Sequence, residues 1–211
     1  MSRKTKAEAE KTRLRILASA LSLFAKKGYE HTTFTDIAAR LKMTKGAVYW
    51  HFDTKEGLLL ALVEEMIAKF QRQLGDLSGQ ELSFPSVAEA MVARAARIVD
   101  DPKGAAFFLL LQTQVKWRAD SMEAVRERLL ARDAKGPYHS FVRAVENDIA
   151  AGRVRADVDP VAVASVGMAT WTGLVRSQIE KFLECDLEKT LRAAYAAMWE
   201  SIRTGKGERR R

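Results

Sequence analysis

The segment from Lys45 to His51 carries side chains suited to contact nucleic acid. Lys45 and Tyr49 are four residues apart, so a helix here places both on one face. Lysine donates to guanine O6 and N7 or to phosphate, and tyrosine donates to phosphate while its ring packs on a thymine methyl. Gly46 leaves this face bare, which permits close approach of a nucleic acid. The segment is therefore predicted to be a short helix for the major groove of DNA, the alternative being a core helix with ordinary aromatic rings.

This helix has its own start signal and its own attachment face. Thr44 is a good N-cap, because its hydroxyl accepts a hydrogen bond from a free N–H group of the first turn. Val48 and Phe52, again four residues apart, share a face that can attach the helix to a core. The sequence thus predicts a capped helix over Thr44 to Phe52 with one buried and one exposed side.

A second short helix is predicted over residues 34–41. Thr35 is expected to cap it, and Asp36 places a negative charge in the first turn, where the helix dipole favours it. Only a two-residue turn separates this helix from the next. Two short helices joined so tightly form a helix-turn-helix unit, whose second helix enters the groove of DNA.

Helices are also predicted on both sides of this unit. Apolar residues recur with a helical period from about residue 7 to residue 27, and two lysines followed by Gly28 are a normal helix ending. A fourth helix is predicted from Asp53 or Thr54 to about Leu74. Residues 8–54 are therefore expected to form a three-helix DNA-binding domain, with its motif at about residues 33–52.

Residues 12 to 58 resemble the N-terminal domain of the TetR/AcrR family of bacterial transcriptional regulators. One departure from that pattern is Lys42, where the family often has glycine. The opening Ser2-Arg3-Lys4-Thr5-Lys6, with Glu8 and Ala9, is similar to the multidrug-efflux-repressor branch. The residues that carry the resemblance are Ile16-Leu17, Ala20, Leu23-Phe24, Gly28-Tyr29, Thr32-Thr33, Ile37-Ala38, Thr44-Lys45-Gly46, Tyr49-Trp50-His51-Phe52, and Lys55 followed by Leu58.

Chemistry and resemblance together give roles to the DNA-facing residues. Lys45 is expected to reach a base edge or a phosphate, and Trp50 either to touch the sugar backbone or to wedge between the small domain and the fourth helix. Thr33, Thr44, His51 and Lys55 are expected to bind phosphate. The full predicted DNA-binding set is Thr33, Thr44, Lys45, Gly46, Tyr49, Trp50, His51 and Lys55.

The charge distribution supports this interpretation independently. The chain has 35 basic and 27 acidic residues, a net charge of +8. Residues 1–60 carry +6, residues 61–199 carry −1 and residues 200–211 carry +3. A basic module on a neutral body is typical of a nucleic-acid-binding protein. The basic tail, residues 205–211, is expected to be disordered.

Composition excludes several classes of protein. No apolar run approaches the ~20 residues needed to span a bilayer, and no signal peptide is expected, so a cytoplasmic protein without membrane contact is predicted. The single cysteine, Cys185, rules out an internal disulfide. His31, His51 and His139 are too scattered for a metal site. With no catalytic cluster and no phosphate-binding glycine loop, neither enzymatic activity nor a cofactor is expected.

The rest of the chain predicts an all-α protein of about nine helices, with residues 55–204 as a larger helical domain. Helices are expected from Pro85 to about Val99, over 105–118, over 121–151 with a break near Gly136, over 160–183, and from Asp186 to about Thr204. The resemblance implies that this domain binds ligand and forms a homodimer. The residues expected to form the dimer interface are Val161, Ala164, Ser165, Met168, Thr172, Val175, Leu191, Ala194, Tyr195, Met198 and Ile202, the alternative being that these helices pack on their own domain.

A small hydrophobic or amphipathic effector is expected to bind the larger domain, because aromatic and apolar residues with a few polar groups are the usual lining of a pocket. The candidate ligand-binding residues are Phe107, Phe108, Leu111, Gln112, Gln114, Trp117, Met122, Phe141, Trp171 and Arg176. The resemblance implies a repressor that the effector releases from a palindromic operator. The alternative is a DNA-binding protein of the same fold with a structural or protein-interaction role and no ligand.

Overall fold

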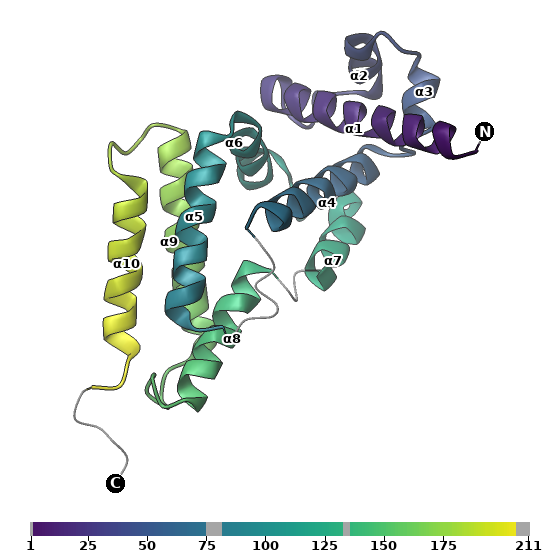
Figure 1. Ribbon diagram of the computed structural model, residues 1–211. Helices are drawn as coiled ribbons and strands as arrows, with labels where there is room; N and C mark the ends of the chain where they lie inside the picture. Colours follow the sequence, from purple (N-terminus) through teal and green to yellow (C-terminus); the bar gives the residue numbers. More distant parts are fainter. Residues whose placement is uncertain (1, 75–81, 133–135, 206–211) are drawn as a thin grey trace. The chain divides into compact units, whose positions relative to one another are not determined.

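The computed structural model describes residues 2–74, 82–132 and 136–205 of the 211-residue chain. All regular elements in these ranges are helices apart from an isolated bridge between Val154 and Arg203, which confirms the all-α prediction (Figure 1). Ten α-helices are present there, against about nine expected. Most of the predicted loop over 75–84 and the tail from 206 onward lie outside the described residues. None of the described helices is long and apolar enough to cross a membrane.

The chain divides into two compact units, each of which is discontinuous in sequence. Unit 1 comprises residues 1–70 and 101–129, and unit 2 comprises 71–100 and 130–211. This grouping differs from the predicted boundary at residue 55, since unit 1 includes most of the fourth helix and a later segment. The elements of unit 1 are α1 (Ser2–Lys27), α2 (Phe34–Leu41), α3 (Lys45–Tyr49), most of α4 (Lys55–Leu74), α6 (Pro102–Leu109), a π-helical turn η2 (Leu110–Gln114), a 3-10 turn η3 (Asp120–Met122) and most of α7 (Glu123–Arg132).

Unit 2 is a bundle of four helices, drawn in teal, green and yellow in Figure 1. Its core contains Phe141, whose ring lies 5.7 Å from that of Phe84 and 5.6 Å from that of Tyr195. The Nε1 of Trp171 donates to the carbonyl of Met91 at 2.8 Å, so this buried indole is satisfied within the bundle. The helices are α5 (Phe84–Asp100), α8 (Pro137–Ala150), α9 (Pro160–Ile179) and α10 (Leu187–Ile202).

A buried carboxylate fastens one end of this bundle. The side chain of Asp148 has no exposure, and its Oδ2 accepts from the backbone N–H of Phe84 at 2.7 Å. Its Oδ1 accepts from the Nε of Arg153 at 2.6 Å. Asp148 on α8 thus satisfies the first N–H of α5, which otherwise has no partner within its helix.

Some predicted helix ends were wrong by a few residues. The expected helix over 121–151 is two helices, α7 and α8, as the break near Gly136 indicated. The expected helix over 105–118 begins earlier, because Asp101 caps it by accepting from Lys103 N–H at 3.0 Å. The helix expected to reach residue 183 ends at Ile179, where Lys181 adopts a left-handed conformation with φ of 57°.

Candidate nucleic-acid interface

The start of α2 is fixed by Thr33, which corrects the prediction that Thr35 is the cap. Thr33 Oγ1 accepts from the backbone N–H of Asp36 at 3.2 Å, and Asp36 Oδ2 accepts from Thr33 N–H at 2.8 Å. This reciprocal pair is a capping box. Thr33 Oγ1 also donates to Asp36 Oδ2 at 2.8 Å, so its hydroxyl proton is engaged within the protein.

Asp36 also ties α2 to the end of α1. The Nζ of Lys27 donates to Asp36 Oδ1 at 2.6 Å. This hydrogen bond, together with those from Thr33, lowers the pKa of Asp36 to about 2. The carboxylate is therefore ionised throughout the physiological pH range, and it joins the start of α2 to the end of α1.

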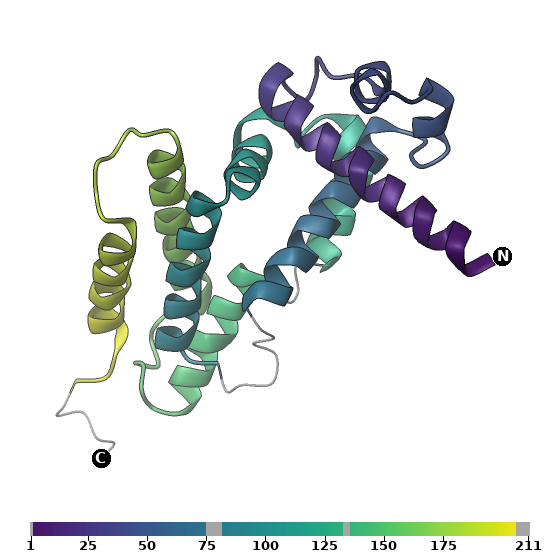
Figure 2. The same cartoon turned by 45° about the horizontal axis from the view of Figure 1, so that its top comes forward.

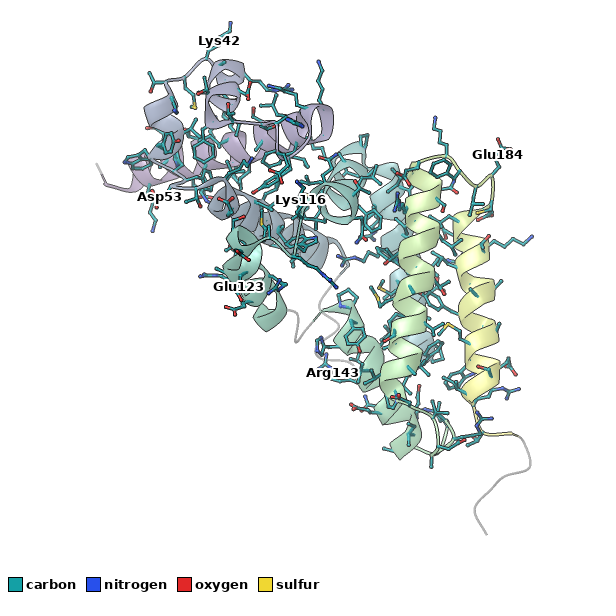
Figure 3. The ribbon with its side chains drawn as sticks, turned by 180° about the vertical axis from the view of Figure 1, so that it is seen from behind. Lys42, Asp53, Lys116, Glu123, Arg143 and Glu184 are labelled. Carbon is teal, nitrogen blue, oxygen red and sulfur yellow. The ribbon has the colours of Figure 1, made fainter. Side chains whose placement is uncertain are left out.

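The turn between α2 and α3 is left-handed at Lys42, with φ of 55° and ψ of 45°. The N–H of Lys42 donates to Ala39 O at 3.2 Å and that of Met43 to Ala38 O at 3.0 Å, which satisfies the last carbonyls of α2. Glycine adopts this conformation without strain, whereas lysine does not. Figure 3 shows the Lys42 side chain pointing away from the ribbon, at the tip of the turn.

The cap predicted for α3 is confirmed. Thr44 Oγ1 accepts from the backbone N–H of Ala47 at 3.2 Å. Val48 has no exposure and attaches α3 to the unit, as its spacing predicted. Another side of the helix carries Lys45 and Gly46, both exposed.

Gly46 leaves open space on this side. A Cβ built on it meets Thr44 Oγ1 at 3.9 Å, an ordinary contact, with no closer neighbour. The fold of unit 1 therefore does not require glycine here. The α3 backbone is accordingly open at this position to close approach from outside the unit.

Aromatic side chains continue this face toward the end of α3. Tyr49 packs edge-on against Phe34 at 4.9 Å between ring centroids, yet remains 45% exposed. The Nζ of Lys45 lies 5.4 Å from the Tyr49 centroid, which holds the ammonium beside the ring. Trp50 is 74% exposed, which disagrees with the alternative that it wedges between the small domain and the fourth helix.

His51 is half-buried beside the exposed tryptophan. The two rings meet edge-to-face, with centroids 4.6 Å apart. Burial lowers the pKa of His51 from its ordinary value of 6.5, and the positive charge of Arg13 lowers it further, against a smaller opposite effect of Glu10. His51 is therefore a neutral imidazole in the free protein at neutral pH. The phosphate contact expected from the sequence would act against this shift, because a negative charge favours the imidazolium.

Lys55, expected at a phosphate, is already engaged at the start of α4. Its Nζ donates to the backbone carbonyls of Tyr29 and Glu30, each at 3.2 Å, and lies 4.5 Å from the Tyr29 ring centroid. Lys55 thus joins α4 to the turn between α1 and α2. The structure gives it a positioning role that the sequence did not reveal.

Tyr29 is the centre of a second long-range contact in unit 1. Its backbone N–H donates to Oε1 of Gln114, the last residue of the π-helical turn η2, at 3.2 Å. The side chain is 2% exposed, and burial, assisted by the charges of Glu56 and Glu30, raises the pKa of its hydroxyl. The turn before α2 is thereby held by α4 on one side and by η2 on the other.

The candidate ligand residues are distributed over both units. Phe141 and Trp171 belong to the core of unit 2, and Arg176 is exposed, with its Nε 2.7 Å from Glu180 Oε2. In unit 1 Trp117 Nε1 donates to the Leu111 carbonyl at 2.9 Å. The seven candidates of unit 1 are Phe107, Phe108 and Met122, which are buried, Leu111, Gln114 and Trp117, which are half-buried, and Gln112, which is exposed.

The residues expected at a dimer interface differ widely in burial. Ala164, Val175, Leu191, Tyr195 and Ile202 are buried inside unit 2 itself. The exposed sides of α9 and α10 instead carry small residues. Those exposed on α9 are Ala162, Ser165, Ala169 and Gly173, together with Val161 and Val166, and those on α10 include Ala193, Ala196 and Ala197.

A surface depression in the loop between α9 and α10 had no signal in the sequence. It is lined by Gln178, Lys181, Leu183, Glu184, Cys185 and Asp186. Cys185 Sγ lies 3.8 Å from Gln178 Oε1. Among the described residues no group of three or more histidine, cysteine or acidic side chains is placed to hold a metal ion.

Fold and site together define a helix-turn-helix protein. Residues 16–62 match the family model of bacterial regulatory proteins, tetR family. The HTH-type transcriptional regulator SrpR of Pseudomonas putida is 39% identical over 92 residues, which are 44% of this chain and 43% of SrpR. The uncharacterized HTH-type transcriptional regulator TtgW, also of Pseudomonas putida, is 38% identical over 92 residues, which are 44% of this chain and 69% of TtgW.

The chain belongs to the TetR family of bacterial regulatory proteins. The match spans less than half of SrpR. Solved structures share the whole fold: NalD, the secondary repressor of the MexAB-OprM multidrug efflux pump in Pseudomonas aeruginosa, has a TM-score of 0.74 and 22% identity, covering 95% of this chain and 100% of NalD. The SmeT–triclosan complex has a TM-score of 0.74 and 24% identity, covering 92% of this chain and 93% of SmeT.

Proposed function

We propose that this protein is a sequence-specific transcriptional repressor that binds operator DNA as a dimer and leaves it when a small hydrophobic or amphipathic ligand binds. The observation that carries the DNA-binding part is the outer face of α3. On a helix capped by Thr44 and fastened by Val48, it exposes Lys45, Gly46 and Tyr49 together. Donors beside a bare backbone are what base and phosphate contacts in a major groove require.

The experiment for this proposal is selection of bound fragments from random DNA by the purified full-length protein. A dimeric regulator should enrich a palindromic motif whose half-sites lie about one helical turn, ~34 Å, apart or a multiple of that. If no motif were enriched and the affinity depended on salt concentration but not on DNA sequence, the proposal would be contradicted and a structural DNA-binding role favoured.

Base reading by Lys45 is tested with the selected motif. Lys45→Ala should relax the preference at one base pair in each half-site and cost about 1–3 kcal/mol of discrimination. Lys42→Ala, at the exposed tip of the neighbouring turn, serves as a control of equal charge change and should leave the base preference intact. If Lys45→Ala and Lys42→Ala each weakened binding to the selected operator and to random DNA by the same factor, base reading by Lys45 would be excluded.

The proposed dimer forms through the exposed sides of α9 and α10. Small side chains such as Ala169 and Gly173 let helices approach closely, and a Cβ on Gly173 would meet nothing within 4 Å in the single chain. Ala169→Glu should therefore dissociate the dimer in sedimentation experiments without unfolding unit 2. Ala124→Glu, an equal change at an exposed position of α7, should leave the dimer intact.

The ligand proposal is supported by the apolar residues of α6, of η2 and of the turn that follows η2, which include Phe107, Leu111 and Trp117. Proteins of the same fold are described in complexes with triclosan and with stearoyl-CoA. A panel of apolar and amphipathic compounds, beginning with triclosan, should contain members that raise the melting temperature of the free protein and displace the operator. A compound that raised the melting temperature without displacing the operator would be a ligand but not an inducer.

A further inference from the structure

The first turns of α1 extend beyond the core of unit 1. Among the α1 side chains that the structure describes, which begin at residue 6, the first buried one is Ile16, although the helix itself begins at Ser2. Figure 2 shows these turns continuing past α3 toward the N-terminus. At 1.5 Å per residue, the stretch from residue 2 to residue 16 is about 20 Å long. It is longer than attachment to the core requires.

Arg13 fixes which side of this extension faces the end of the recognition helix. Its guanidinium carbon lies 5.8 Å from the centroid of the Phe52 ring, which follows α3. Arg13 Nη1 also donates to Glu10 Oε1 at 3.2 Å, so the negative charge of Glu10 is offset locally. The face of α1 that carries Arg13 is thus the face beside Phe52, in the segment that follows α3.

Lys6 lies on the same face as Arg13. Seven residues are two turns of an α-helix within about 20°, so Lys6 stands about 10.5 Å further along the axis than Arg13. Its side chain is exposed. Lys11, by contrast, is rotated by about 160° from Arg13 and is exposed on the opposite side of the helix.

We infer that the Arg13 face of the α1 extension, through Lys6, is a second DNA-contacting surface that binds phosphates bordering the groove occupied by α3. The major groove is about 12 Å wide and is bounded by phosphates, and Lys6 stands a comparable distance, about 10.5 Å along α1, from the residue that contacts the segment following α3. A contact of this kind adds affinity and fixes register but reads no base. The inference rests on the proposed DNA-binding function.

The test compares Lys6→Gln with the matched control Lys11→Gln in the full-length protein. Both variants remove one charge from an exposed position of the same helix, and glutamine has a helix propensity close to that of lysine. Affinity for the selected operator is measured over a range of salt concentrations. Lys6→Gln should reduce the slope of log Kobs against log salt by about 0.9, the value for one phosphate contact, whereas Lys11→Gln should leave it unchanged. Lys6→Glu and Lys11→Glu should enlarge the same difference.

The inference would be overturned if the wild-type protein bound the operator but Lys6→Gln and Lys11→Gln had the same slope of log Kobs against log salt, whether reduced or unchanged. Failure of the wild-type protein to bind any operator would instead overturn the proposed function. Thermal unfolding of each variant, expected to match the wild type, shows that the fold is not the cause.

Discussion

Gln114 and Tyr29 are 85 residues apart in the sequence, yet Gln114 Oε1 accepts a hydrogen bond from the Tyr29 backbone N–H at 3.2 Å. Gln114 ends a π-helical turn, and such turns frequently occur at functional sites. Tyr29 lies in the turn that precedes α2. Under the proposed function, we expect a ligand that displaces η2 to act on α2 and α3 through this bond.

Replacement of this glutamine tests the connection. Gln114→Ala should lower the free energy of unfolding by about 1 kcal/mol, because the half-buried N–H of Tyr29 loses its acceptor. It should also reduce the ratio between operator affinities measured without and with an inducing compound. Gln112→Ala, an equal truncation of an exposed side chain in the same turn, should change neither quantity. An undiminished ratio for Gln114→Ala would exclude this bond as the connection.

Lys42→Gly removes the strain of the left-handed turn. We expect a stability gain of about 0.5–1 kcal/mol, since relief of the left-handed conformation outweighs the greater entropy of glycine in the unfolded chain. Lys181→Gly, which relieves the same conformation in unit 2, is the control for stability. If the outward Lys42 side chain also binds a phosphate, only Lys42→Gly should lower the salt slope of operator binding, by about 0.9.

Gly46→Ala separates folding from DNA binding. The added Cβ meets no close neighbour, and alanine is favoured over glycine in a helix by up to about 1 kcal/mol, so the melting temperature should stay level or rise. Operator affinity should nevertheless fall about tenfold, equivalent to ~1.4 kcal/mol, because the methyl group intrudes where DNA approaches. Unchanged affinity, measured by titration of labelled operator, would show that DNA does not approach this position closely.

The sequence predicted the local elements of the DNA-binding unit well. The span of α2 and the Thr44 cap follow from signals within a few residues, because capping and helical period are local properties. The correct cap of α2 also had a local signal, since Thr33 and Asp36 have the spacing of a capping box. The interpretation of Thr35 as the cap overlooked that spacing.

Long-range contacts were not predictable in the same way. No pattern around Lys55 indicates that its ammonium binds the carbonyls of residues 29 and 30, which are distant in sequence. For the last two helices the difficulty is different. A helical period of large apolar residues indicates that one face is buried but does not identify the element that covers it. Leu191 and Tyr195 were therefore predicted at a dimer interface, whereas they are buried in unit 2 itself.

The pKa of His51 gives a prediction for the free protein. It is lowered from 6.5 in the folded state, so the unfolded chain takes up this proton first as the pH falls. The contribution of His51 to stability is therefore fully present above 6.5 and decreases as the pH falls through that value toward the folded pKa. His51→Gln should flatten the dependence of melting temperature on pH in that window. An identical pH dependence in the variant would contradict the assignment.

Operator binding should move the same pKa in the opposite direction. If His51 contacts a phosphate, the negative charge favours the imidazolium, and the pKa rises on binding. By linkage, operator affinity should then increase as the pH falls between the bound and the free pKa, and His51→Gln should abolish this increase. NMR titration of the imidazole in the free and DNA-bound protein measures both values directly. A pKa that stays low in the complex would contradict an ion pair between His51 and a phosphate.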